Sequence, residues 1–486
     1  MKLSQIISKT DISLLSNQDI EIDNITFDSR ECSTNSLFVA IKGETSDGHD
    51  YIAKAIELGA TAIIYELNHY TPSDTYNNIV FLGSRQVRKT LALMASNFYS
   101  NPSEDFNLIG VTGTNGKTTI ATLLYNLYSD LGYKCGLIST IANYIGPNKY
   151  EATHTTPDPV HLNSLLSQMR DYGCEYCFME VSSHSLAQER VTGLRFKGAI
   201  FTNLTHDHLD YHHTFMEYLK CKKLLFDNLS KDAFALTNID DKNGNTMVQN
   251  TSAKIYSYST RNSADFMVNI LEKSIEGSLL KIDRQEVWSQ FIGTHNAHNL
   301  AAVYGVATIL GVEKMEALTA ISNLKTVAGR LEYINGGENL TAVVDYAHTP
   351  DALENVLKTL KDISAANELI TVFGCGGNRD KAKRPEMAKI AAKYSNRIII
   401  TSDNPRFEKA EDIMDDINSG LSPIDRKIAL NIVDRKEAIK TAILTAKPNS
   451  IILIAGKGHE NYQIINGVKS HFDDKEIINE CFNLIN

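Results

Sequence analysis

The sequence predicts an α/β protein of about three domains. Its 486 residues exceed what one hydrophobic core usually organises. Short apolar runs of strand length alternate with helical patterns, which favours parallel sheets with helices between the strands. Polar clusters follow several of these runs, where open α/β sheets bind their ligands. We expect a small N-terminal α/β domain at 1–99, a central parallel-sheet domain at 100–329 and a C-terminal Rossmann-like α/β domain at 330–486.

The first unit shows strand and helix patterns in alternation. The strands are expected at 25–30, 36–41 and 62–65, and the helices at 51–58 and 85–100. Gly59 is a suitable residue to end the first helix, and Asn101-Pro102 ends the second. A polar turn at 43–48 could hold a ligand or could be a solvated loop.

The central unit begins with a glycine-rich turn between an apolar run and a helix. Residues 110–119 read Gly-Val-Thr-Gly-Thr-Asn-Gly-Lys-Thr-Thr, and leucines at helical spacing follow. In this context backbone N–H groups close around phosphate oxygens. Lys117 would neutralise charge between the outer phosphates, and the Thr118 hydroxyl would bind Mg²⁺. The strict phosphate-loop pattern requires glycine where this chain has Val111, so a plain glycine-rich turn with a surface lysine is the alternative.

Two later strands of the central unit end in acidic and histidine residues. They are the runs 177–181 and 198–202, whose carboxyl ends should lie beside the glycine-rich turn. A metal–nucleotide site is therefore expected. Glu180 offers the oxygen ligand that Mg²⁺ prefers, and His208 is a possible nitrogen ligand, whereas the lack of thiolates disfavours zinc. His206 and His208 could instead only form hydrogen bonds within their loop.

Two helices of the central unit carry polar residues with more than one interpretation. The helix 215–228 contains Lys220, Lys222 and Lys223, and such a charge run is usually a solvated helix face. Asn296 lies at the start of a strongly apolar helix. Asparagine amides there could contact an adenine edge, or Asn296 could simply cap the helix.

In the last unit, four predicted strands end in polar clusters. The strands lie near 341–345, 369–374, 397–401 and 451–455. The clusters occupy 345–350, 374–380, 403–406 and 456–460. Because these strand ends should share one edge of a sheet, the clusters predict a cleft whose arginines can bind a carboxylate-bearing ligand.

Composition indicates an ordinary globular protein and argues against two classes of partner. Charged residues make up 22% and hydrophobic residues 43% of the chain. The net charge of −10 argues against general nucleic-acid binding, and no apolar run approaches the ~18 residues of a membrane span. The first residues lack a signal-peptide pattern, and seven scattered cysteines fit a reducing cytoplasm.

Cys174 and Cys177, a lone Cys-x-x-Cys, are expected to be core thiols. We expect a cytoplasmic monomer.

An ordered set of motifs resembles the Mur ligases, the enzymes that build the bacterial cell-wall precursor. The motifs are 112–119, 180–184, 207–208, 293–299, 329–330 and 345–350. The phosphate loop of that family also departs from the strict pattern, so Val111 agrees with the resemblance. Residues 28–30, 154–157 and 403–406 are similar to the branch that extends UDP-N-acetylmuramoyl-L-alanyl-D-glutamate.

The resemblance implies an ATP-dependent amide ligase of peptidoglycan synthesis, and hence a role in cell shape and division. The D-glutamate γ-carboxylate of the nucleotide substrate would attack the γ-phosphorus of ATP, and an amine would then attack the acyl phosphate. The implied catalytic and metal-binding residues are Lys117, Thr118, Glu180, His208 and Lys222. The implied ATP-binding residues are Gly113, Thr114, Asn115, Gly116, Lys117, Thr118, Thr119, Asn299, Arg330 and Asp345.

The resemblance gives Lys222 a second interpretation, as a lysine modified by carbon dioxide. The family carries an N-carboxylated lysine in a context similar to residues 221–226. The carbamate would bind a second Mg²⁺. Lys223 is the alternative position.

The resemblance also assigns residues to the two remaining substrates. Those implied for the UDP-MurNAc-dipeptide are Ser29, Glu44, Thr45, Ser46, Thr155, Thr156, Ser182, Gln188 and Arg190. Those implied for the amino acid are Arg379, Asp403, Asn404, Pro405, Arg406, Gly456 and Glu460. Family members that add meso-diaminopimelate carry Asp-Asn-Pro-Arg, as this chain does at 403–406. L-Lysine would leave a buried arginine unpaired, so meso-diaminopimelate is expected.

Other activities remain open at this point. The same ligation could use L-lysine. A folylpolyglutamate-synthase-like ligase shares the central and last units but lacks the extra N-terminal domain of about 100 residues found here. A phosphate-loop kinase or motor ATPase would hydrolyse ATP without a UDP-linked peptide. A non-catalytic UDP-sugar binder would have no use for Lys117, Glu180 and His208 together.

Overall fold

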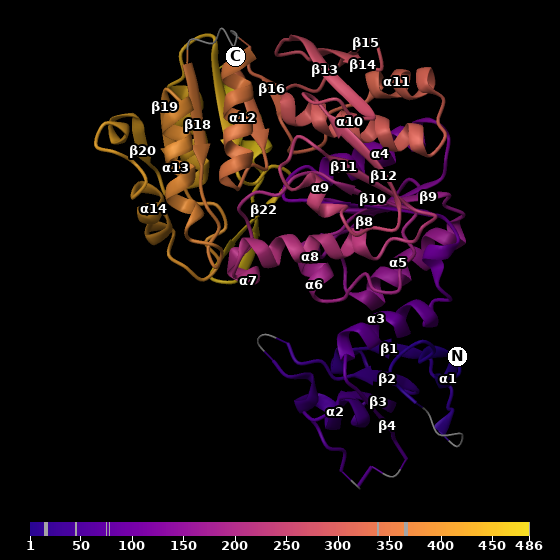
Figure 1. Cartoon of the computed structure of the whole chain (residues 1–486). Coiled ribbons are helices and arrows are strands. Elements are labelled where there is room, and N and C mark those ends of the chain that lie inside the picture. Colours follow the sequence, from indigo (N-terminus) through magenta and orange to yellow (C-terminus); the bar gives the residue numbers. More distant parts are fainter. Residues whose placement is uncertain are drawn as a thin grey trace.

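The computed structural model contains three sheet-centred units. The N-terminal unit lies beneath the central unit, and the C-terminal unit lies beside the central one (Figure 1). The structure describes residues 1–13, 18–43, 46–73, 75–76, 78–337, 340–363 and 368–485. Each unit packs helices against its own sheet, which confirms the predicted α/β class.

In the part of the N-terminal unit that the structure describes, four strands form a parallel sheet in the order β1-β2-β3-β4. Its elements are α1 (Leu3–Ile6), β1 (Asn24–Thr26), β2 (Ser36–Val39), α2 (Ile52–Glu57), β3 (Ala60–Glu66), β4 (Val80–Ser84) and α3 (Val87–Phe98). The prediction of a strand at 25–30 is wrong for its second half, because β1 ends at Thr26. The Asp28 carboxylate accepts a hydrogen bond from the backbone N–H of Arg30 at 3.0 Å and begins a 3₁₀ turn at Ser29–Glu31.

The central unit is built on an eleven-stranded sheet, counted within the described residues. Its strands are β5 (Asn107–Thr112), β6 (Cys135–Ile138), β7 (Ala142–Ile145), β8 (Asn148–Glu151), β9 (Tyr176–Glu180), β10 (Gly198–Phe201), β11 (Phe234–Asn238), β12 (Lys254–Ser259), β13 (Phe266–Lys273), β14 (Ser278–Ile282) and β15 (Gln285–Ser289). Its helices are α4 (Lys117–Asp130), α5 (Pro159–Tyr172), α6 (Ser183–Ala187), α7 (Leu209–His212), α8 (Phe215–Asp227), α9 (Gly244–Met247), α10 (Thr294–Ile309) and α11 (Lys314–Asn323).

Strand β5 lies in the middle of this sheet, between β9 and β10, and both of its faces are covered. Ile109 packs into one hydrophobic cluster with α4, α10 and α11, whereas its neighbour Leu108 packs into the other with α5 and α8. Since side chains alternate along a strand, this continuous apolar run predicts a strand with helices on both sides. The carboxyl end of β5 therefore emerges from the middle of a rigid layered core.

The predicted parallel arrangement is found in the middle of the central sheet, and the sheet extends beyond it at both ends. Strands β6, β9, β5, β10, β11, β12 and β13 run parallel, but β7-β8 and β14-β15 continue the sheet by antiparallel pairing. The β14-β15 turn has positive φ angles at Asp283 (46°) and Arg284 (69°), the tight hairpin geometry that joins antiparallel strands. The prediction considered strands that alternate with helices and so omitted these hairpins.

Over its described residues, the C-terminal unit has a six-stranded sheet in the order β16-β17-β21-β18-β19-β20, parallel except for the β16-β17 pair. Its strands are β16 (Glu332–Asn335), β17 (Thr341–Asp345), β18 (Glu368–Phe373), β19 (Arg397–Ile400), β20 (Ala429–Asn431) and β21 (Ser450–Ala455), with a separate hairpin of β22 (Tyr462–Ile465) and β23 (Val468–His471). Its helices are α12 (Pro350–Ile363), α13 (Lys383–Tyr394), α14 (Ala410–Asn418), α15 (Arg435–Leu444) and α16 (Asp474–Ile485). The four strands predicted before polar clusters are β17, β18, β19 and β21.

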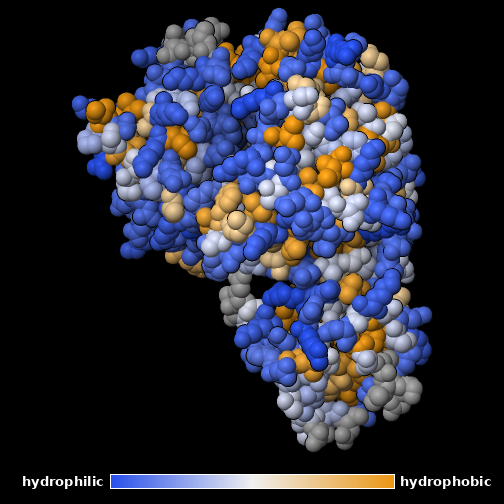
Figure 2. All heavy atoms as spheres, viewed as in Figure 1, coloured by the Kyte–Doolittle hydropathy of each residue, from blue (hydrophilic) through white to orange (hydrophobic). Residues whose placement is uncertain are grey.

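Two expectations from composition can be compared with the structure. Among the described residues, no helix has the length and apolar character needed to cross a membrane. All seven cysteines are buried and free, and Cys174 and Cys177 pack in the core between the central sheet and α5. The prediction of core thiols is confirmed. Figure 2 shows a surface on which polar and apolar side chains are mixed over all three units.

Candidate active site

The glycine-rich turn joins β5 to α4, as predicted, and holds the lysine that follows it. Lys117 Nζ donates hydrogen bonds to the carbonyl oxygens of Gly113 and Thr114, at 2.9 and 2.8 Å. Val111 is a fully buried residue of β5, so the loop begins after it and needs no glycine there. The first turn of α4 leaves backbone N–H groups available to an anion at this position.

Replacing Gly116 with alanine is expected to weaken ATP binding by about tenfold or more, because the new Cβ would lie 2.8 Å from Asn299 Oδ1 and displace the loop. Gly132→Ala is the matched control: φ is 91° at Gly132 and 88° at Gly116, but the space around a Cβ at Gly132 is open. Both variants carry a left-handed backbone cost of about 1–2 kcal/mol. Calorimetric titration with ATP measures the difference, and equal affinities in the two variants would contradict the role of this loop.

Two oxygen-bearing side chains meet just beyond the loop. The Thr118 hydroxyl donates to Glu180 Oε2 at 2.9 Å, and Glu180 Oε1 accepts from the backbone N–H of Thr140 at 2.7 Å. Glu180 ends β9 and is 1% exposed. Thr118 lies in the first turn of α4, which follows β5, and β5 pairs directly with β9, so the two predicted metal-binding oxygens meet beside the loop.

The two histidines after β10 have different surroundings. His206 Nε2 lies 3.1 Å from Asp380 Oδ2 of the C-terminal unit, so it forms a hydrogen bond between units. His208 lies beside Asp207, with 3.3 Å between Nε2 and Oδ2, and its φ is 56°. Burial lowers the pKa of His208 below its ordinary value, against the effect of Asp207, and so favours the neutral imidazole that can bind a cation.

Lys222 is buried at 1% exposure, so the solvated-face interpretation is wrong for this residue. Its Nζ donates to Gly113 O at 2.8 Å, the same oxygen that accepts from Lys117, and lies 4.7 Å from the centroid of the Tyr218 ring. Burial, followed by the charge of Lys117, lowers the pKa of Lys222 well below its ordinary value. The alternative residue, Lys223, pairs instead with Asp227 on its own helix.

A cavity of about 260 Å³, here called the inner cavity, lies between the central and C-terminal units. From the central unit it is lined by loop residues 114–118, by Thr140, Thr155 and Glu180, and by Asp207, His208 and Asp210. From the C-terminal unit it is lined by Arg330, Tyr346, His348, Gly376, Arg379, Asp380, Lys383, Asp403, Asn404, Arg406, Gly456 and Glu460. The polar clusters predicted at four strand ends therefore do form one cleft, and it faces the phosphate loop.

Six of the seven residues predicted for the amino acid line the inner cavity. Pro405 does not. A Cβ added to Gly377 would lie 2.0 Å from the carbonyl oxygen of Pro405, so the two backbones are closely packed. Pro405 therefore shapes the turn from which its neighbours reach the inner cavity. Arg406 Nη1 donates to Gly377 O at 2.8 Å, and Asn404 Nδ2 donates to Glu460 Oε2 at 2.8 Å.

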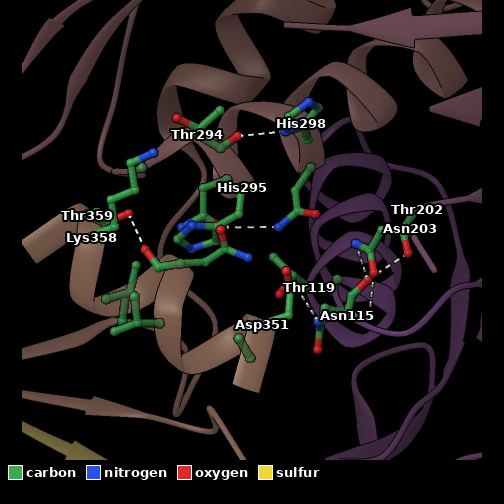
Figure 3. A pocket seen from close by; sticks show the side chains of 18 of the residues that line it. Asn115, Thr119, Thr202, Asn203, Thr294, His295, His298, Asp351, Lys358 and Thr359 are labelled. Carbon is green, nitrogen blue, oxygen red and sulfur yellow. Dashed lines mark hydrogen bonds between the residues drawn. The ribbon is translucent and has the colours of Figure 1, made fainter. Parts of the chain in front are cut away.

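A second cavity, of about 290 Å³ and here called the α10 cavity, opens beside the loop (Figure 3). Asn115, Gly116, Thr119, Asn299, Arg330 and Asp345, all predicted to bind ATP, line it. The capping interpretation of Asn296 is wrong, because Gly293 occupies the N-cap and the Asn296 side chain accepts from Asn299 Nδ2 at 3.1 Å. Burial raises the pKa of Asp345 to about 6, and its carboxylate accepts from the backbone N–H of Leu331.

A third cavity, of about 780 Å³ and here called the lower cavity, lies between the N-terminal and central units. Ser29, Ser46, Gln188 and Arg190 line it, so the turn that could be either a ligand site or a solvated loop does reach a cavity through Ser46. Glu44 and Thr45 lie outside the described residues.

Three residues predicted for the UDP-linked substrate do not line the lower cavity. Thr155 lines the inner cavity. Thr156 Oγ1 donates to Glu180 O at 2.8 Å, and Ser182 Oγ caps α6 by accepting from the backbone N–H of Ser185. Arg190 links this group to the lower cavity, since its Nη1 donates to Thr156 O at 2.7 Å.

Sequence reasoning missed several residues that line these cavities. Arg30, Lys54 and Arg88 supply positive charge to the lower cavity, and His348 and Lys383 line the inner one. Lys54 and Arg88 lie on the predicted helices 51–58 and 85–100, and no sequence motif in these helices indicates a ligand. His348 lies in the predicted polar cluster 345–350 without an assigned role, whereas Lys383 begins α13, just beyond the predicted cluster 374–380.

Comparison with known proteins agrees with this arrangement. Models of the Mur ligase family match in three parts: its catalytic domain at 21–99, its middle domain at 111–307 and its glutamate ligase domain at 329–458. A relative from Bacteroides fragilis, named UDP-N-acetylmuramoyl-L-alanyl-D-glutamate--2,6-diaminopimelate ligase, is 52% identical over 486 residues and 100% of both chains. A Clostridioides difficile relative of the same name is 43% identical over 490 residues, covering 99% of both.

Solved structures give the same result. A structure with the same ligase name has a TM-score of 0.69 at 34% identity and covers 100% of this chain and 99% of its own. Folylpolyglutamate synthase from Mycobacterium tuberculosis shares the fold at 16% identity and a TM-score of 0.62, but covers only 77% of this chain. Three models of the family match this chain, and full-length relatives share 43% to 52% of its residues. The chain therefore belongs to the Mur ligase family.

Proposed function

We propose that the chain is an ATP-dependent, ADP-forming ligase that adds meso-diaminopimelate to the D-glutamate γ-carboxylate of UDP-N-acetylmuramoyl-L-alanyl-D-glutamate. Its full-length relatives carry this name. The observation that carries the proposal is the inner cavity, where Lys117 of the phosphate loop faces Arg379, Arg406 and Glu460. An activated carboxylate and an incoming amino acid can meet there. The product would serve peptidoglycan synthesis.

The three units take three roles in this proposal. Residues 1–99 hold the UDP-sugar end, residues 100–329 bind ATP, and residues 330–486 bind the amino acid. The support is the position of the cavities: the lower one between the first two units, the α10 cavity beside the loop, and the inner one between the last two.

The triphosphate of ATP lies on the loop in this proposal, with the nucleoside in the α10 cavity. Lys117 would exchange its two carbonyl acceptors for phosphate oxygens, which are stronger partners because they are charged. Arg330 lines both the α10 and the inner cavity and donates to Thr118 Oγ1 at 3.3 Å, so its guanidinium reaches the same phosphates from the C-terminal unit.

The reaction has two steps, and each conserves atoms and charge. An oxygen of the γ-carboxylate attacks the γ-phosphorus of ATP, ADP leaves, and an acyl phosphate forms. The neutral amine of diaminopimelate attacks the acyl carbon, phosphate leaves, and the nitrogen loses a proton. The first step brings two anions together, so positioning and cationic side chains such as Lys117 account for most of its catalysis.

The residues around Thr118 suit Mg²⁺. The Thr118 hydroxyl and the buried Glu180 carboxylate present oxygen atoms to the inner cavity, and the neutral His208 imidazole lines the same space. Bound there, Mg²⁺ would neutralise charge on the phosphate oxygens of ATP. We propose Thr118, Glu180 and His208 as its ligands.

Lys222 is proposed to react with carbon dioxide and to become a carbamate that helps bind a second Mg²⁺. Two lysines share the Gly113 carbonyl, so two ammonium groups would repel each other there. Burial favours the neutral amine of Lys222, the form that attacks carbon dioxide. The resulting anion would remove the repulsion with Lys117.

Replacing Lys222 with alanine is expected to lower kcat by about 10²-fold or more, because the carbamate oxygens would be lost. Formate or acetate should restore part of the activity by occupying the vacated space. Lys223→Ala is the matched control, since Lys223 is the adjacent residue of α8 and pairs with Asp227. Phosphate release measures all three conditions, and full activity of the unrescued Lys222 variant would refute the carbamate.

The UDP-linked dipeptide would occupy the lower cavity and extend toward Glu180. The proposed contacts are Ser29, Glu44, Thr45 and Ser46 from the N-terminal unit, and Thr155, Thr156, Ser182, Gln188 and Arg190 from the central unit. The Thr155 hydroxyl accepts a hydrogen bond from the Thr140 hydroxyl at 3.0 Å on the side of the inner cavity, and Arg190 lines the lower cavity. Together they mark a path between the two cavities along which the dipeptide could lie.

The choice of amino acid would follow from charge at the far end of the inner cavity. meso-Diaminopimelate carries a carboxylate and an ammonium group at its distal carbon, whereas L-lysine carries the ammonium alone. Arg406, with Arg379 beside it, can receive the carboxylate, and Glu460 can receive the ammonium. Asp403, Asn404, Pro405 and Gly456 complete the proposed pocket.

One phosphate-release assay separates this proposal from its alternatives. ATP, Mg²⁺ and the UDP-linked dipeptide are combined with meso-diaminopimelate, L-lysine or no amino acid. Fast release only with diaminopimelate is expected. Phosphate release with lysine alone would indicate the lysine-adding reaction, and release without any amino acid a motor ATPase. ADP formation without phosphate release would indicate a kinase, and neither product a non-catalytic binder. We further propose that the protein acts as a monomer in the cytoplasm, which light scattering and fractionation would test.

A further inference from the structure

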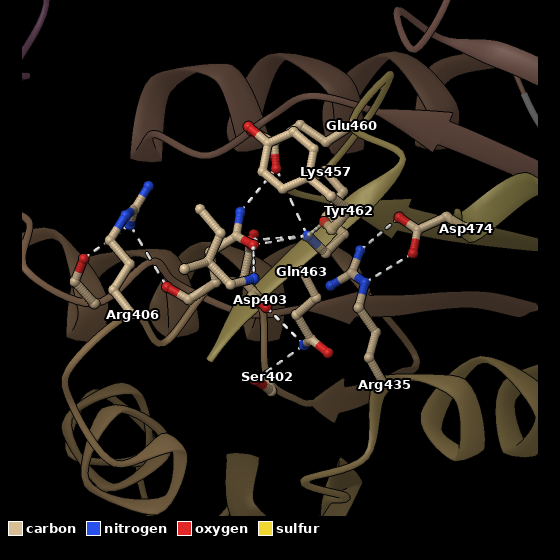
Figure 4. Close-up of polar contacts among 12 residues, drawn as sticks. Ser402, Asp403, Arg406, Arg435, Lys457, Glu460, Tyr462, Gln463 and Asp474 are labelled. Carbon is tan, nitrogen blue, oxygen red and sulfur yellow. Dashed lines mark hydrogen bonds and ion pairs between the residues drawn. The ribbon is translucent and has the colours of Figure 1, made fainter. Parts of the chain in front are cut away.

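Lys457 is a fully buried lysine behind the far end of the inner cavity. It lies in the loop after β21 and is 0% exposed. Its Nζ donates to Tyr462 O at 2.6 Å and to Asn404 Oδ1 at 3.1 Å. Figure 4 shows this ammonium group at the centre of a polar network that joins the loops after β19 and β21 to the hairpin of β22. Lys457 does not itself line the cavity.

The contact with Lys457 fixes how the Asn404 side-chain amide is oriented. Asn404 Oδ1 accepts from Lys457 Nζ and from the backbone N–H of Ile464, at 3.1 and 3.0 Å. Two donors on one atom identify it as the oxygen, so the NH₂ group must point the other way. Nδ2 donates one hydrogen to Glu460 Oε2 at 2.8 Å. Among the described residues Nδ2 has no second acceptor, so its other N–H is available to a ligand in the inner cavity, which Asn404 lines.

Lys457 also lies between two carboxylates. Its Nζ is 3.6 Å from Glu460 Oε2 and 3.8 Å from Asp403 Oδ1. Glu460 and Asp403 both line the inner cavity, and their like charges oppose each other. Among the described residues, these two carboxylates are the ion-pair partners of the buried Lys457 ammonium, so the loss of Lys457 would leave two buried carboxylates facing each other.

We propose that Lys457 is a positioning residue for the amino-acid substrate: it holds the Asn404 amide and the Asp403 and Glu460 carboxylates in the arrangement that receives the charged distal end of diaminopimelate. This inference rests on the proposed function. Arg406 would bind the distal carboxylate directly, whereas Lys457 acts through Asn404 and Glu460 without touching the substrate.

The charge of Lys457 should also set the pH range in which Glu460 binds an ammonium group. Burial, followed by the charge of Asp403, raises the pKa of Glu460, and Lys457, Asn404 and Tyr346 lower it. The titratable groups that face Glu460 are Asp403 after β19, Lys457 after β21, Tyr346 after β17 and Tyr462 on β22, with Arg435 on α15 behind them. Removing one positive charge from this set raises the pKa of Glu460 further, so its carboxylate would become protonated at a higher pH.

The test measures the KM for diaminopimelate and kcat against pH in Lys457→Met, Lys457→Arg and the wild type. We expect Lys457→Met to raise the KM for diaminopimelate by about 30-fold or more, with kcat and the KM for ATP changed only a few-fold. The pH below which the KM rises should move upward by about one unit or more. Lys457→Arg should return that pH toward the wild-type value, because it keeps the charge. Lys436→Met is the control, since Lys436 is an exposed lysine of the same unit.

Other outcomes decide the inference separately from the proposed function. If Lys457→Met does not fold, Lys457→Gln replaces it, because glutamine keeps a hydrogen-bond donor but lacks the charge. An unchanged KM, or a loss of kcat without a shift in pH dependence, would overturn the positioning role. If the wild type itself releases no phosphate with diaminopimelate, the proposed function fails instead.

Discussion

Replacing Lys117 with alanine is expected to lower kcat by about 10³-fold or more, with the fold retained. Lys117 is the first residue of α4 and reaches back to the Gly113 and Thr114 carbonyls, so its ammonium is held where the phosphates of ATP would lie. The transferred phosphoryl group and the attacking carboxylate are both anionic, and their approach requires a cation fixed in advance. Alanine removes that cation while leaving the helix intact.

The matched control for this variant is Lys197→Ala. Lys197 is exposed and immediately precedes β10. It therefore lies at the amino ends of the parallel strands, whereas the phosphate loop lies at their carboxyl ends. Phosphate release with all substrates measures activity, and circular dichroism checks the fold. A Lys117 variant within tenfold of the wild type would mean that ATP is not bound at this loop.

Replacing Arg406 with alanine should produce the second large effect, a loss of about 10³-fold or more in kcat/KM for meso-diaminopimelate. The Arg406 guanidinium lines the inner cavity, and one of its nitrogens already bonds Gly377 O at 2.8 Å, which fixes the side chain before the substrate binds. Removing the guanidinium leaves the distal carboxylate without its partner. L-Lysine has no such carboxylate, so the low kcat/KM that we expect for L-lysine should change little.

Arg426→Ala is the control for general loss of positive charge, since Arg426 is exposed in the same unit. Arg406→Lys gives a finer comparison, because lysine keeps the charge but cannot bind a carboxylate with two parallel hydrogen bonds. Competition between diaminopimelate and lysine in one reaction, followed by mass spectrometry, measures the preference directly. If the preference for diaminopimelate survived in Arg406→Ala, selection by Arg406 would be disproved.

Sequence reasoning predicted those parts of the site that depend on local order. The turn at 113–116, the strand that ends at Glu180 and the four polar clusters of the C-terminal sheet follow from alternation of strands and helices. Parallel strands present their carboxyl ends at one edge, so residues distant in sequence could be expected to meet there. Thr118 and Glu180, which form a 2.9 Å hydrogen bond, are the clearest case.

The remaining features depend on packing between elements, which local patterns do not encode. Lys222 belongs to a run of lysines that is typical of a solvated surface, yet α8 turns this residue toward Gly113. Lys457 belongs to the predicted polar cluster 456–460, but its burial depends on the hairpin of β22 and β23, where Tyr462 accepts a hydrogen bond from it. The hairpins at the ends of the central sheet were likewise missed because they contain no intervening helix.

The most direct test of the central claim, that the substrate carboxylate attacks ATP before the amide forms, is an isotope-transfer measurement. UDP-N-acetylmuramoyl-L-alanyl-D-glutamate with both γ-carboxylate oxygens labelled as ¹⁸O is converted with ATP, Mg²⁺ and diaminopimelate, and the products are examined by mass spectrometry. The acyl-phosphate route predicts one ¹⁸O in the released phosphate and one in the new amide. Unlabelled phosphate, or phosphate released without an amide product, would contradict it.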